Sequence, residues 1–285
     1  MARPPDMLRV GRIPYINTYP VYGAVDRGIV SLDATLVNGV PSALNAQMAA
    51  GALNVSVVSA VEYAAHADRY LLLPDLAITC DGPVRSVMLF SKRPVAELDG
   101  ATVLVSRSSM TSVQLLSLLF SERWGVTPRL VAADAESADI KNFGREPHDA
   151  RLVIGDAALL LSSGTNEAAR AYPHQVDLGL AWKEWTGLPF VFAVWVAQRS
   201  TPVEDALRVH SRLIASRDWG IAHLPSLAAQ AALATGVARA TCETYLSGLD
   251  YRLSLPHLRG LTEFYRRLDA TGRLQAQPLV FLSAA

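Results

Sequence analysis

The sequence predicts an α/β protein of two lobes, between which the chain crosses twice. Short apolar strands alternate with polar loops and helices, a rhythm typical of a parallel sheet covered by helices. Two long apolar segments, 84–91 and 190–197, bracket a region that has strands of its own, and the chain after 198 is predicted to be helical. Two crossings make a hinge, so the expected ligand site is the cleft between the lobes.

The first part of the chain repeats a strand–loop–helix unit. The first strand ends in a polar and aromatic loop at 14–18, and Pro41 with Ser42 opens the second helix. Gly51 follows that helix, as expected of a C-cap. In chain order, the predicted elements are strands at 8–13, 34–37 and 53–58 and helices at 20–27, 44–50 and 59–66.

The middle of the chain repeats the same unit with strands rich in Val, Leu and Ile, so it is expected to have a core of its own. We therefore predict that lobe I comprises residues 1–91 and 198–285, and that lobe II, 92–197, is inserted in it. The further strands predicted in this region are 101–106, 129–132 and 151–154, and its helices are 111–120 and 156–161.

The last part of the chain carries signals for helix ends. Thr201–Glu204 has the pattern of a capping box, with Pro202 at the first helical position. Helices are predicted to end at Gly236, Gly248 and Gly272, because glycine is the residue most often found just after a helix. These helices are assigned to lobe I.

Composition excludes several classes of protein. The 285 residues include 26 Lys and Arg and 26 Asp and Glu, so the formal net charge is zero. A neutral chain lacks the positive field that a nucleic-acid binder needs, so no nucleic-acid partner is predicted. Hydrophobic residues make up 51% of the chain, which is enough for a large core and too much for a disordered protein.

Apolar stretches argue against a membrane or secreted protein. The longest of them, Leu188–Ala197, is about half the length that a helix needs to cross a bilayer. Residues 1–6 are not followed by the apolar stretch of a secretory signal. We therefore expect a cytoplasmic protein with no membrane association, while the sequence does not fix its oligomeric state.

Motifs for the commonest catalytic and cofactor chemistries are absent from the sequence. No two glycines are four residues apart, and neither the dinucleotide-binding nor the P-loop glycine pattern occurs. The six histidines form no pair at i, i+4, and Cys80 and Cys242 stand alone, as expected of two buried thiols. No metal and no cofactor are therefore predicted.

The loops after the predicted strands offer hydroxyls and helix N-termini. Ser109 and Thr111 stand between a strand and a helix, where they either hold a carboxylate or phosphate or simply cap the helix, the commoner role. Asp156, after Gly155, is either a first-turn carboxylate favoured by the helix dipole or an acid in the cleft. Asn17 is either a hydrogen-bonding group at a strand end or an ordinary turn residue.

Other candidates also have two interpretations. Ser42, at the start of a helix, carries the same ambiguity as the serine and threonine described above. Arg12, Arg85 and Arg107 stand near predicted strand ends, where each either pairs with an anionic substrate or faces solvent. These residues alone therefore leave the chemistry open.

Six segments taken together carry a recognisable set of motifs. They are GRIPYINTYP at 11–20, GVPSALN at 39–45, YLLLPDL at 70–76, DGPVRSV at 81–87, IGDAAL at 154–159 and WKEWTGLPFVFAVW at 182–195. This set resembles the chorismate dehydratase family of the futalosine pathway of menaquinone biosynthesis. The last motif is long and specific, and the matches span about residues 8–197.

The resemblance implies a type II periplasmic-binding-protein-like fold and the conversion of chorismate to 3-[(1-carboxyvinyl)oxy]benzoate and water. It assigns Asn17 and Ser86 to the reacting centre as catalytic residues. The one departure noted is Met110, which stands where a small residue is more usual and is expected to narrow the pocket slightly. With the strand-end loops, the expected substrate-binding residues are Tyr15, Thr18, Ser42, Ser59, Ser109, Thr111, Gly155, Asp156, Pro189 and Phe190.

The expected chemistry is an elimination that makes the ring aromatic. Neither Asn17 nor Ser86 is a strong base, because an amide does not act as a general base and a serine needs an activating partner. We therefore hypothesise that the enolpyruvyl carboxylate of the substrate removes the C3 proton. Asn17 would orient that carboxylate, Ser86 would hydrogen-bond the leaving hydroxyl, and Ser42, Ser109 and Thr111 would anchor carboxylates.

Two non-enzymatic functions are compatible with the same fold class, because fold does not fix function. One is a solute-binding protein for a small carboxylate ligand, which the absence of a predicted signal peptide disfavours. The other is the effector-sensing domain of a regulator, which normally comes attached to a DNA-binding module. The resemblance favours an enzyme that removes water from chorismate, a carbon–oxygen lyase, over both of these functions.

Overall fold

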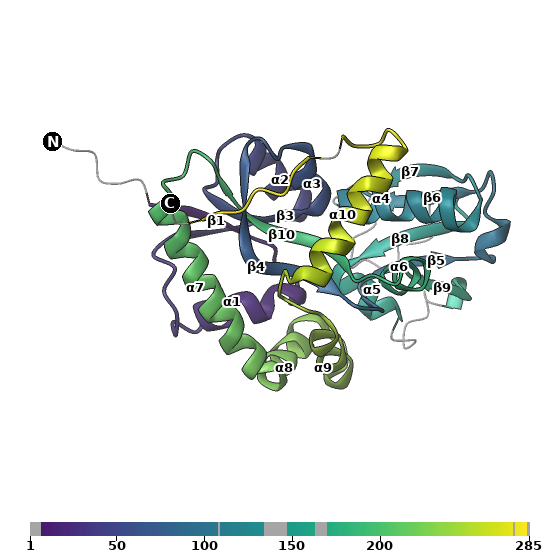
Figure 1. The fold of residues 1–285 in the computed structure, drawn as a ribbon. Helices are drawn as coiled ribbons and strands as arrows, with labels where there is room; N and C mark the ends of the chain where they lie inside the picture. The colour runs from purple at the N-terminus through teal and green to yellow at the C-terminus, as the bar shows by residue number, and fades with distance from the viewer. Residues whose placement is uncertain (1–6, 108, 134–146, 163–169, 276, 284–285) are drawn as a thin grey trace.

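The computed structural model describes residues 7–107, 109–133, 147–162, 170–275 and 277–283. Its strands form two five-stranded sheets, one in each of two lobes that lie side by side (Figure 1). The predicted two-lobed α/β architecture is therefore confirmed. In the part of the chain that the structure describes, no helix combines the length and apolar character that crossing a membrane requires.

The first sheet has the strand order β2-β1-β3-β10-β4. β1 is parallel to β2 and to β3, whereas β10 is antiparallel to both of its neighbours, β3 and β4. The C-terminal ends of β1 and β3 therefore reach the same edge, where a ligand site is expected. The strands are β1 (Arg9–Arg12), β2 (Thr35–Asn38), β3 (Val55–Ser59), β4 (Tyr70–Cys80) and β10 (Phe190–Gln198).

The second sheet repeats this design with the order β7-β6-β8-β5-β9. β6 is parallel to β7 and β8, and β5 is antiparallel to β8 and β9. Each sheet is therefore mixed rather than purely parallel, because one strand in each returns against the others. The strands are β5 (Val87–Ser91), β6 (Thr102–Ser106), β7 (Arg129–Ala133), β8 (Ala150–Ile154) and β9 (His174–Asp177).

The antiparallel strands correct the predicted lobe boundaries. β5 lies in the second sheet although the prediction 1–91 placed it in lobe I, and β10 lies in the first sheet although 92–197 placed it in lobe II. The chain crosses instead just before each of these strands, at 81–86 and 187–189. Glycine and proline occur in both crossings, so the chain turns there. The apolar character of β5 and β10 predicted that both are strands. It did not indicate the sheet to which each of them belongs.

Helices follow the strands in both lobes, and the helices predicted in the first half are present with shifts of a few residues at their ends. A short 3₁₀ turn, η1 (Ile16–Thr18), precedes the first of them. The helices are α1 (Tyr19–Asp26), α2 (Pro41–Ala49), α3 (Ala60–Ala65), α4 (Met110–Leu118), α5 (Gly155–Ser162), α6 (Leu178–Thr186), α7 (Val203–Ala222), α8 (Leu224–Thr235), α9 (Arg239–Gly248) and α10 (Leu255–Ala270), with short turns η2 (Val95–Glu97) and η3 (Leu119–Trp124).

Three of these elements, β4, β9 and α6, were not predicted. β4 is irregular, because Asp75 has a φ of 53° within it and its pairing with β10 shifts register twice. Its alternation is therefore broken by a residue that disfavours a strand. β9 has only four residues, which is too short for a periodic signal.

The helical tail follows the prediction at its C-termini and departs from it at one N-terminus. α8 is followed by Gly236 in the left-handed conformation, α9 ends at Gly248, and Gly272 lies in the turn after α10. The capping box predicted at Thr201 does not form. The Thr201 hydroxyl donates instead to the Asn54 carbonyl at 3.3 Å, and α7 begins one residue later than predicted.

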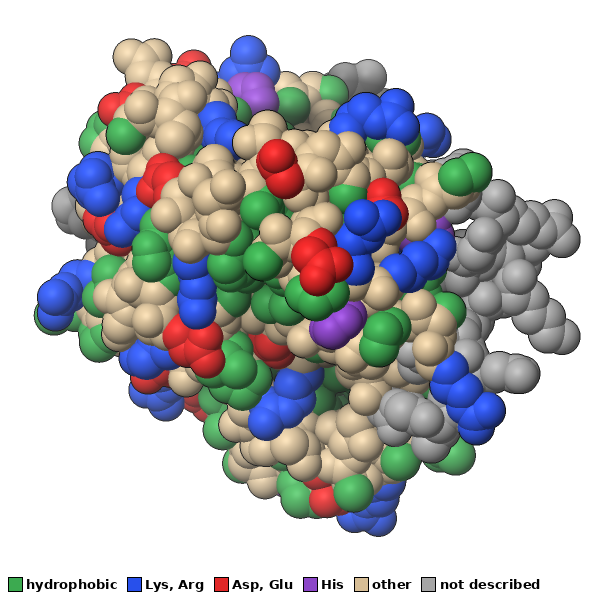
Figure 2. Space-filling model, turned by 90° about the vertical axis from the view of Figure 1, so that its right-hand side faces the viewer, with side chains coloured by type: hydrophobic (Ala, Val, Ile, Leu, Met, Phe, Trp, Pro, Cys, Tyr) green, Lys and Arg blue, Asp and Glu red, His purple; other side chains and the backbone are tan. Residues whose placement is uncertain are grey.

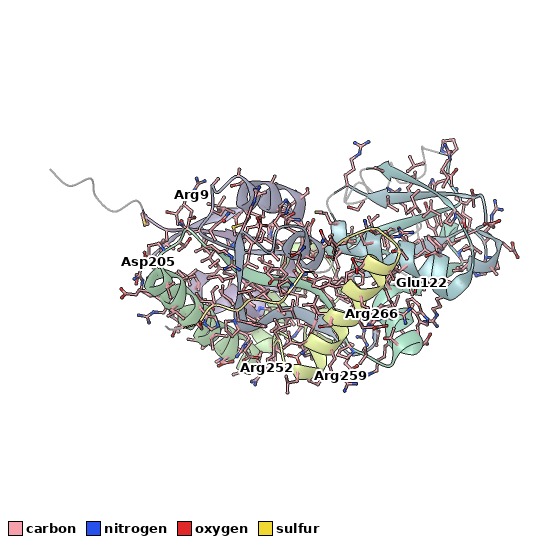
Figure 3. All side chains as sticks on the ribbon, turned by 45° about the horizontal axis from the view of Figure 1, so that its top comes forward. Arg9, Glu122, Asp205, Arg252, Arg259 and Arg266 are labelled. Carbon is pink, nitrogen blue, oxygen red and sulfur yellow. The ribbon has the colours of Figure 1, made fainter. Side chains whose placement is uncertain are left out.

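The last helix, α10, joins the two lobes. It crosses from the first lobe towards the second, as the yellow ribbon in Figure 1 shows. Gly260 allows α10 to pack closely against the second crossing, because an added Cβ would lie 2.0 Å from the Pro189 carbonyl oxygen. Arg267 on α10 pairs with Glu122 of the second lobe at 2.6 Å; Figure 3 labels Glu122 and Arg266, the chain neighbour of Arg267. The tail thus bridges the two lobes.

The surface of the second lobe mixes charges of both signs. On the face in Figure 2, basic and acidic side chains are interspersed and hydrophobic ones lie between them. This distribution agrees with the zero net charge of the chain. It differs from the one-signed surface that steers a protein towards nucleic acid.

Candidate functional site

A cavity lies between the lobes, where strand ends and helix starts of both sheets converge. Its floor is apolar and its polar groups are hydroxyls, an amide and the backbone of a glycine, a composition typical of small-molecule sites. Among the described residues that line it, no side chain is charged. The lining residues are Ile13, Tyr15, Asn17, Pro41, Ser59, Ile78, Val84, Ser86, Val87, Ser109, Thr111, Ser112, Ile154, Gly155, Phe192 and Ala193.

Asn17 reaches the cavity from the turn η1, which follows β1. The hydroxyl of Thr18 donates to the carbonyls of Ile13 and Tyr15, both at 2.9 Å, and so fixes this turn. Thr18 is buried and does not line the cavity, so it shapes the loop rather than facing a ligand. The Asn17 Oδ1 atom is buried without a hydrogen-bond partner among the described residues. An unpaired buried acceptor costs free energy, which points to a donor that a ligand supplies.

Ser86 reaches the cavity from a tight turn at the first crossing. Its backbone N–H donates to the Val84 carbonyl at 2.8 Å, closing a three-residue turn in which Arg85 has a φ of 62°. This left-handed conformation is strained for arginine. The carboxylate of Asp177 holds it, accepting from the N–H groups of Val84 at 3.0 Å and Arg85 at 2.6 Å. Ser86 is thus presented to the cavity by a turn that another strand end stabilises.

A tyrosine from the helical tail contacts Ser86. The hydroxyl of Tyr245, on α9, donates to Ser86 Oγ at 2.8 Å, and both residues are buried. The two lie 159 residues apart in the chain. Sequence reasoning missed Tyr245, and no signal in the sequence pairs these positions.

One contact between the lobes, which we call the hydroxyl junction, consists of Val61 and Thr111. The N–H of Val61, in the first turn of α3, donates to Thr111 Oγ1 of α4 at 3.2 Å. Next to it, Ser59 caps α3 by accepting from the N–H of Glu62 at 3.0 Å, and the amide of Asn45 donates to Ser59 at 3.2 Å. Ser59 and Thr111 both line the cavity and also perform structural roles. Thr111 does not cap its own helix, because the N-cap of α4 is Ser109, so Thr111 contacts Val61 and lines the cavity instead.

Among the other candidate residues near α2 and α4, Ser109 lines the cavity, whereas Ser42 and Met110 do not. Ser109 lines the cavity and caps α4, accepting from the N–H of Ser112 at 3.4 Å, while Ser108 lies outside the described residues. Ser42 is half-buried in α2 and outside the lining, to which α2 contributes its first residue instead. Met110 is 36% exposed, and its sulfur accepts from the amide of Asn45 at 3.4 Å. It lies outside the lining, so the expected narrowing of the pocket does not follow.

The second contact between the lobes, the carboxyl junction, consists of Ile16 and Asp156. The N–H of Ile16 donates to Asp156 Oδ1 at 3.3 Å. Burial raises the pKa of Asp156 to about 6, although the N–H of Ile16 opposes this shift. Gly155 lines the cavity with a φ of 66°, and an added Cβ would lie 3.3 Å from the ring of Tyr15. Asp156 itself is not part of the lining, so its carboxyl lies behind the loop that carries Asn17.

Pro189, in the second crossing, and Phe190, the first residue of β10, are not among the residues that line the cavity. The Pro189 carbonyl accepts from the indole N–H of Trp182 at 3.2 Å. Phe190 is 1% exposed and packs against Trp182 and Phe264, with ring centroids 5.3 and 5.0 Å apart. These two residues therefore build the hinge, while Phe192, two positions further along β10, faces the cavity.

The three candidate arginines do not line the cavity. Arg12 pairs with Asp26, Arg107 donates to a backbone carbonyl at 3.2 Å, and Arg85 donates to one at 3.4 Å. Within the described ranges, no cluster of three or more His, Cys, Asp or Glu side chains has the arrangement of a metal site. An anionic ligand in this cavity would therefore meet hydroxyls and helix N-termini rather than guanidinium groups.

Comparison with known sequences identifies a family and a curated relative. The family model for menaquinone biosynthesis matches residues 8–270. A curated relative, the chorismate dehydratase of Thermus thermophilus, is 32% identical over 268 residues, which are 90% of this chain and 95% of the relative. The similarity thus covers both lobes and every lining residue of the cavity.

Comparison with solved structures supports the fold. A protein from Archaeoglobus fulgidus superposes with a TM-score of 0.77 at 20% identity, covering 93% of this chain and 97% of its own. The alkanesulfonate-binding protein of Xanthomonas axonopodis pv. citri, bound to MOPS, superposes with a TM-score of 0.68 at 15% identity, covering 99% of this chain and 98% of its own. The predicted periplasmic-binding-protein-like fold is therefore confirmed.

Proposed function

The chain belongs to the menaquinone biosynthesis family, and we propose that it is a carbon–oxygen lyase that removes water from chorismate to give 3-[(1-carboxyvinyl)oxy]benzoate. The relative at 32% identity, named chorismate dehydratase, supports this substrate and reaction. The structural observation that carries the proposal is the convergence of Asn17 and Ser86, from two different strand ends, on one cavity between the lobes.

The cavity suits a small dianion although its lining is uncharged. Chorismate has two carboxylates on a compact ring, and the apolar floor of the cavity offers a surface for that ring. The helices α2, α4 and α5 begin at the cavity, and the N-terminus of a helix carries a partial positive charge and free N–H groups. The hydroxyls of Ser59, Ser109 and Thr111 supply further donors for carboxylate oxygens.

The reaction removes the proton from C3 and the hydroxyl from C4, and the ring becomes aromatic. The enolpyruvyl carboxylate of chorismate takes the proton, and the ring carboxylate delocalises the charge that develops. As the C4–O bond breaks, the departing hydroxide takes that proton from the enolpyruvyl carboxyl and leaves as water. Asn17 holds the enolpyruvyl group through its amide, and Ser86 donates a hydrogen bond to the departing hydroxyl. The protein then contributes orientation and exclusion of water, which are large terms when reacting groups are held in contact.

Asp156 is the alternative base near this site. Its raised pKa, about 6, would suit proton transfer near neutral pH. Its carboxyl, however, accepts from the N–H of Ile16 and lies outside the cavity lining. We therefore assign it to the contact between the lobes and not to the reaction.

The direct test is to incubate the purified protein with chorismate and no added metal or cofactor. The loss of the diene absorbance follows the reaction, and mass spectrometry identifies the product. We expect many turnovers and a product lighter by one water that retains the enolpyruvyl group. A heat-denatured sample controls for spontaneous decay of chorismate. Unchanged chorismate with a folded protein would contradict the proposal and favour a binding protein without catalysis.

The same assay tests whether the enolpyruvyl carboxylate of the substrate or a protein group removes the proton. Asn17→Asp places a carboxylate where the amide stood and is expected to lower turnover, because it repels the enolpyruvyl carboxylate. Asp156→Asn is expected to retain turnover. Equal or greater activity of Asn17→Asp would indicate that a protein group at this position removes the proton.

A further inference from the structure

We propose that Tyr245 is a positioning residue for Ser86: its phenol donates to Ser86 Oγ and leaves the Ser86 proton to point into the cavity. This inference rests on the proposed dehydration, in which Ser86 donates to the leaving hydroxyl. It adds to that site a residue from α9, in the helical tail, whose described residues are not part of the cavity lining.

The geometry gives the Ser86 hydroxyl one fixed partner. The O–O distance to Tyr245 is 2.8 Å, the usual length of a hydrogen bond between hydroxyls. The backbone of Ser86 is already engaged, because its N–H donates to Val84 and its carbonyl accepts from the N–H of Gly155 at 2.8 Å. Only the rotation of the hydroxyl remains to be set, and Tyr245 occupies one of its acceptor positions.

The direction of the hydrogen bond follows from acidity. A phenol is a stronger acid than an aliphatic alcohol, so Tyr245 donates and Ser86 accepts. Burial raises the pKa of Tyr245 well above its ordinary value; the bond to Ser86 opposes this shift, and the nearby Asp156 adds to it. The phenol therefore keeps its proton throughout the pH range of an assay. A hydroxyl that accepts one hydrogen bond becomes a better donor of the next, so Tyr245 also strengthens Ser86 as a donor.

The chain offers a matched control in Tyr251. Its ring is fully buried like that of Tyr245, but its hydroxyl has no hydrogen-bond partner among the described residues. The two tyrosines follow one another in the tail, and each Tyr→Phe change removes one buried oxygen atom. Tyr251→Phe therefore reproduces the packing effect of Tyr245→Phe without the contact to Ser86.

The first experiment compares kcat and KM for chorismate in the wild type, Tyr245→Phe and Tyr251→Phe. Loss of one hydrogen bond that acts in the transition state predicts a fall in kcat of roughly 3- to 10-fold for Tyr245→Phe, with KM changed less than about 2-fold. Tyr251→Phe is expected to match the wild type, and thermal melting checks that each variant is folded. An unchanged kcat for Tyr245→Phe, or an equal loss in Tyr251→Phe, would overturn the inference.

The second experiment asks whether Tyr245 acts through Ser86. Ser86→Ala is expected to lower kcat by about 10²–10³, as loss of a transition-state donor does, which leaves turnover measurable at high enzyme concentration. In this background, Tyr245→Phe is expected to have no further effect. The same loss in both backgrounds would show a purely structural role. If the wild type does not convert chorismate, the proposed function fails and the inference fails with it; if only the cycle is additive, the inference alone fails.

Discussion

The two junctions across the cleft have the same arrangement but differ in the accepting group, which is a hydroxyl in one and a carboxyl in the other. In each, a backbone N–H of the first lobe donates to a side-chain oxygen in the first turn of a helix in the second lobe. The hydroxyl junction joins Val61 to Thr111 at 3.2 Å, and the carboxyl junction joins Ile16 to Asp156 at 3.3 Å. Thr111 keeps a proton of its own to donate, whereas an ionised carboxylate has none.

This difference assigns the two sides of the cavity different tasks. A carboxylate of the substrate is attracted to a side where hydroxyls donate, and it is repelled by Asp156 when that residue is ionised. We therefore expect the hydroxyl junction to bind the substrate and the side with Asn17 and Ser86 to carry the reaction.

The largest expected effect is that of Asn17→Ala. If Asn17 orients the reacting group, kcat should fall by about 10²–10³. The free energy of unfolding should stay within about 1 kcal/mol of the wild type, because the substitution removes a buried oxygen that has no partner. Turnover and chemical denaturation measure the two quantities. A variant that loses both activity and stability would show that Asn17 supports the fold.

The next largest effect concerns pH and Asp156. Its pKa is raised from 3.8 to about 6 in the folded protein, so between these values the folded state binds a proton that the unfolded state lacks. This contribution to stability is present in full below the lower value and is lost as the pH rises through about 6. Its size is about 3 kcal/mol, because each pKa unit corresponds to about 1.4 kcal/mol. Asp156→Asn should remove that part of the pH dependence, which denaturation at several pH values measures. Identical pH profiles in the two proteins would contradict the raised pKa.

A smaller effect is expected for Thr111→Val at the hydroxyl junction. The substitution keeps the shape of the side chain, removes a donor to the substrate and leaves the N–H of Val61 without its partner. KM for chorismate should rise about 10-fold, with kcat changed by less than about 3-fold. Steady-state kinetics separate the two constants. A fall in kcat at constant KM would place Thr111 with the reacting groups.

The smallest expected effect is that of Gly155→Ala. The added Cβ meets a left-handed φ of 66° and lies 3.3 Å from the ring of Tyr15. The strain should lower the free energy of unfolding by about 1 kcal/mol. Gly187→Ala is a control for the conformational term, since Gly187 has a similar φ of 73° and open space around it. Equal losses in both variants would mean that the contact with Tyr15 adds nothing.

Local features of the sequence foretold much of the fold and part of the site. Strands such as β3 and β8 are apolar runs bounded by turn residues, and Asn17 and Ser86 lie within recognisable motifs. Whether a strand joins one sheet or the other depends on contacts distant in the chain, so β5 and β10 were assigned to the wrong lobes. Tyr245 was not predicted for the same reason, because its partner, Ser86, lies 159 residues away in the chain.

The central claim, that one junction binds and the other side reacts, is tested most directly by binding without chemistry. Calorimetric titration with the reaction product, 3-[(1-carboxyvinyl)oxy]benzoate, compares the wild type, Thr111→Val and Ser86→Ala. We predict that Thr111→Val weakens binding about 10-fold and that Ser86→Ala stays within about 3-fold of the wild type, because the product no longer has the hydroxyl that Ser86 contacts. The reverse pattern, or an equal loss in both variants, would contradict the division of tasks.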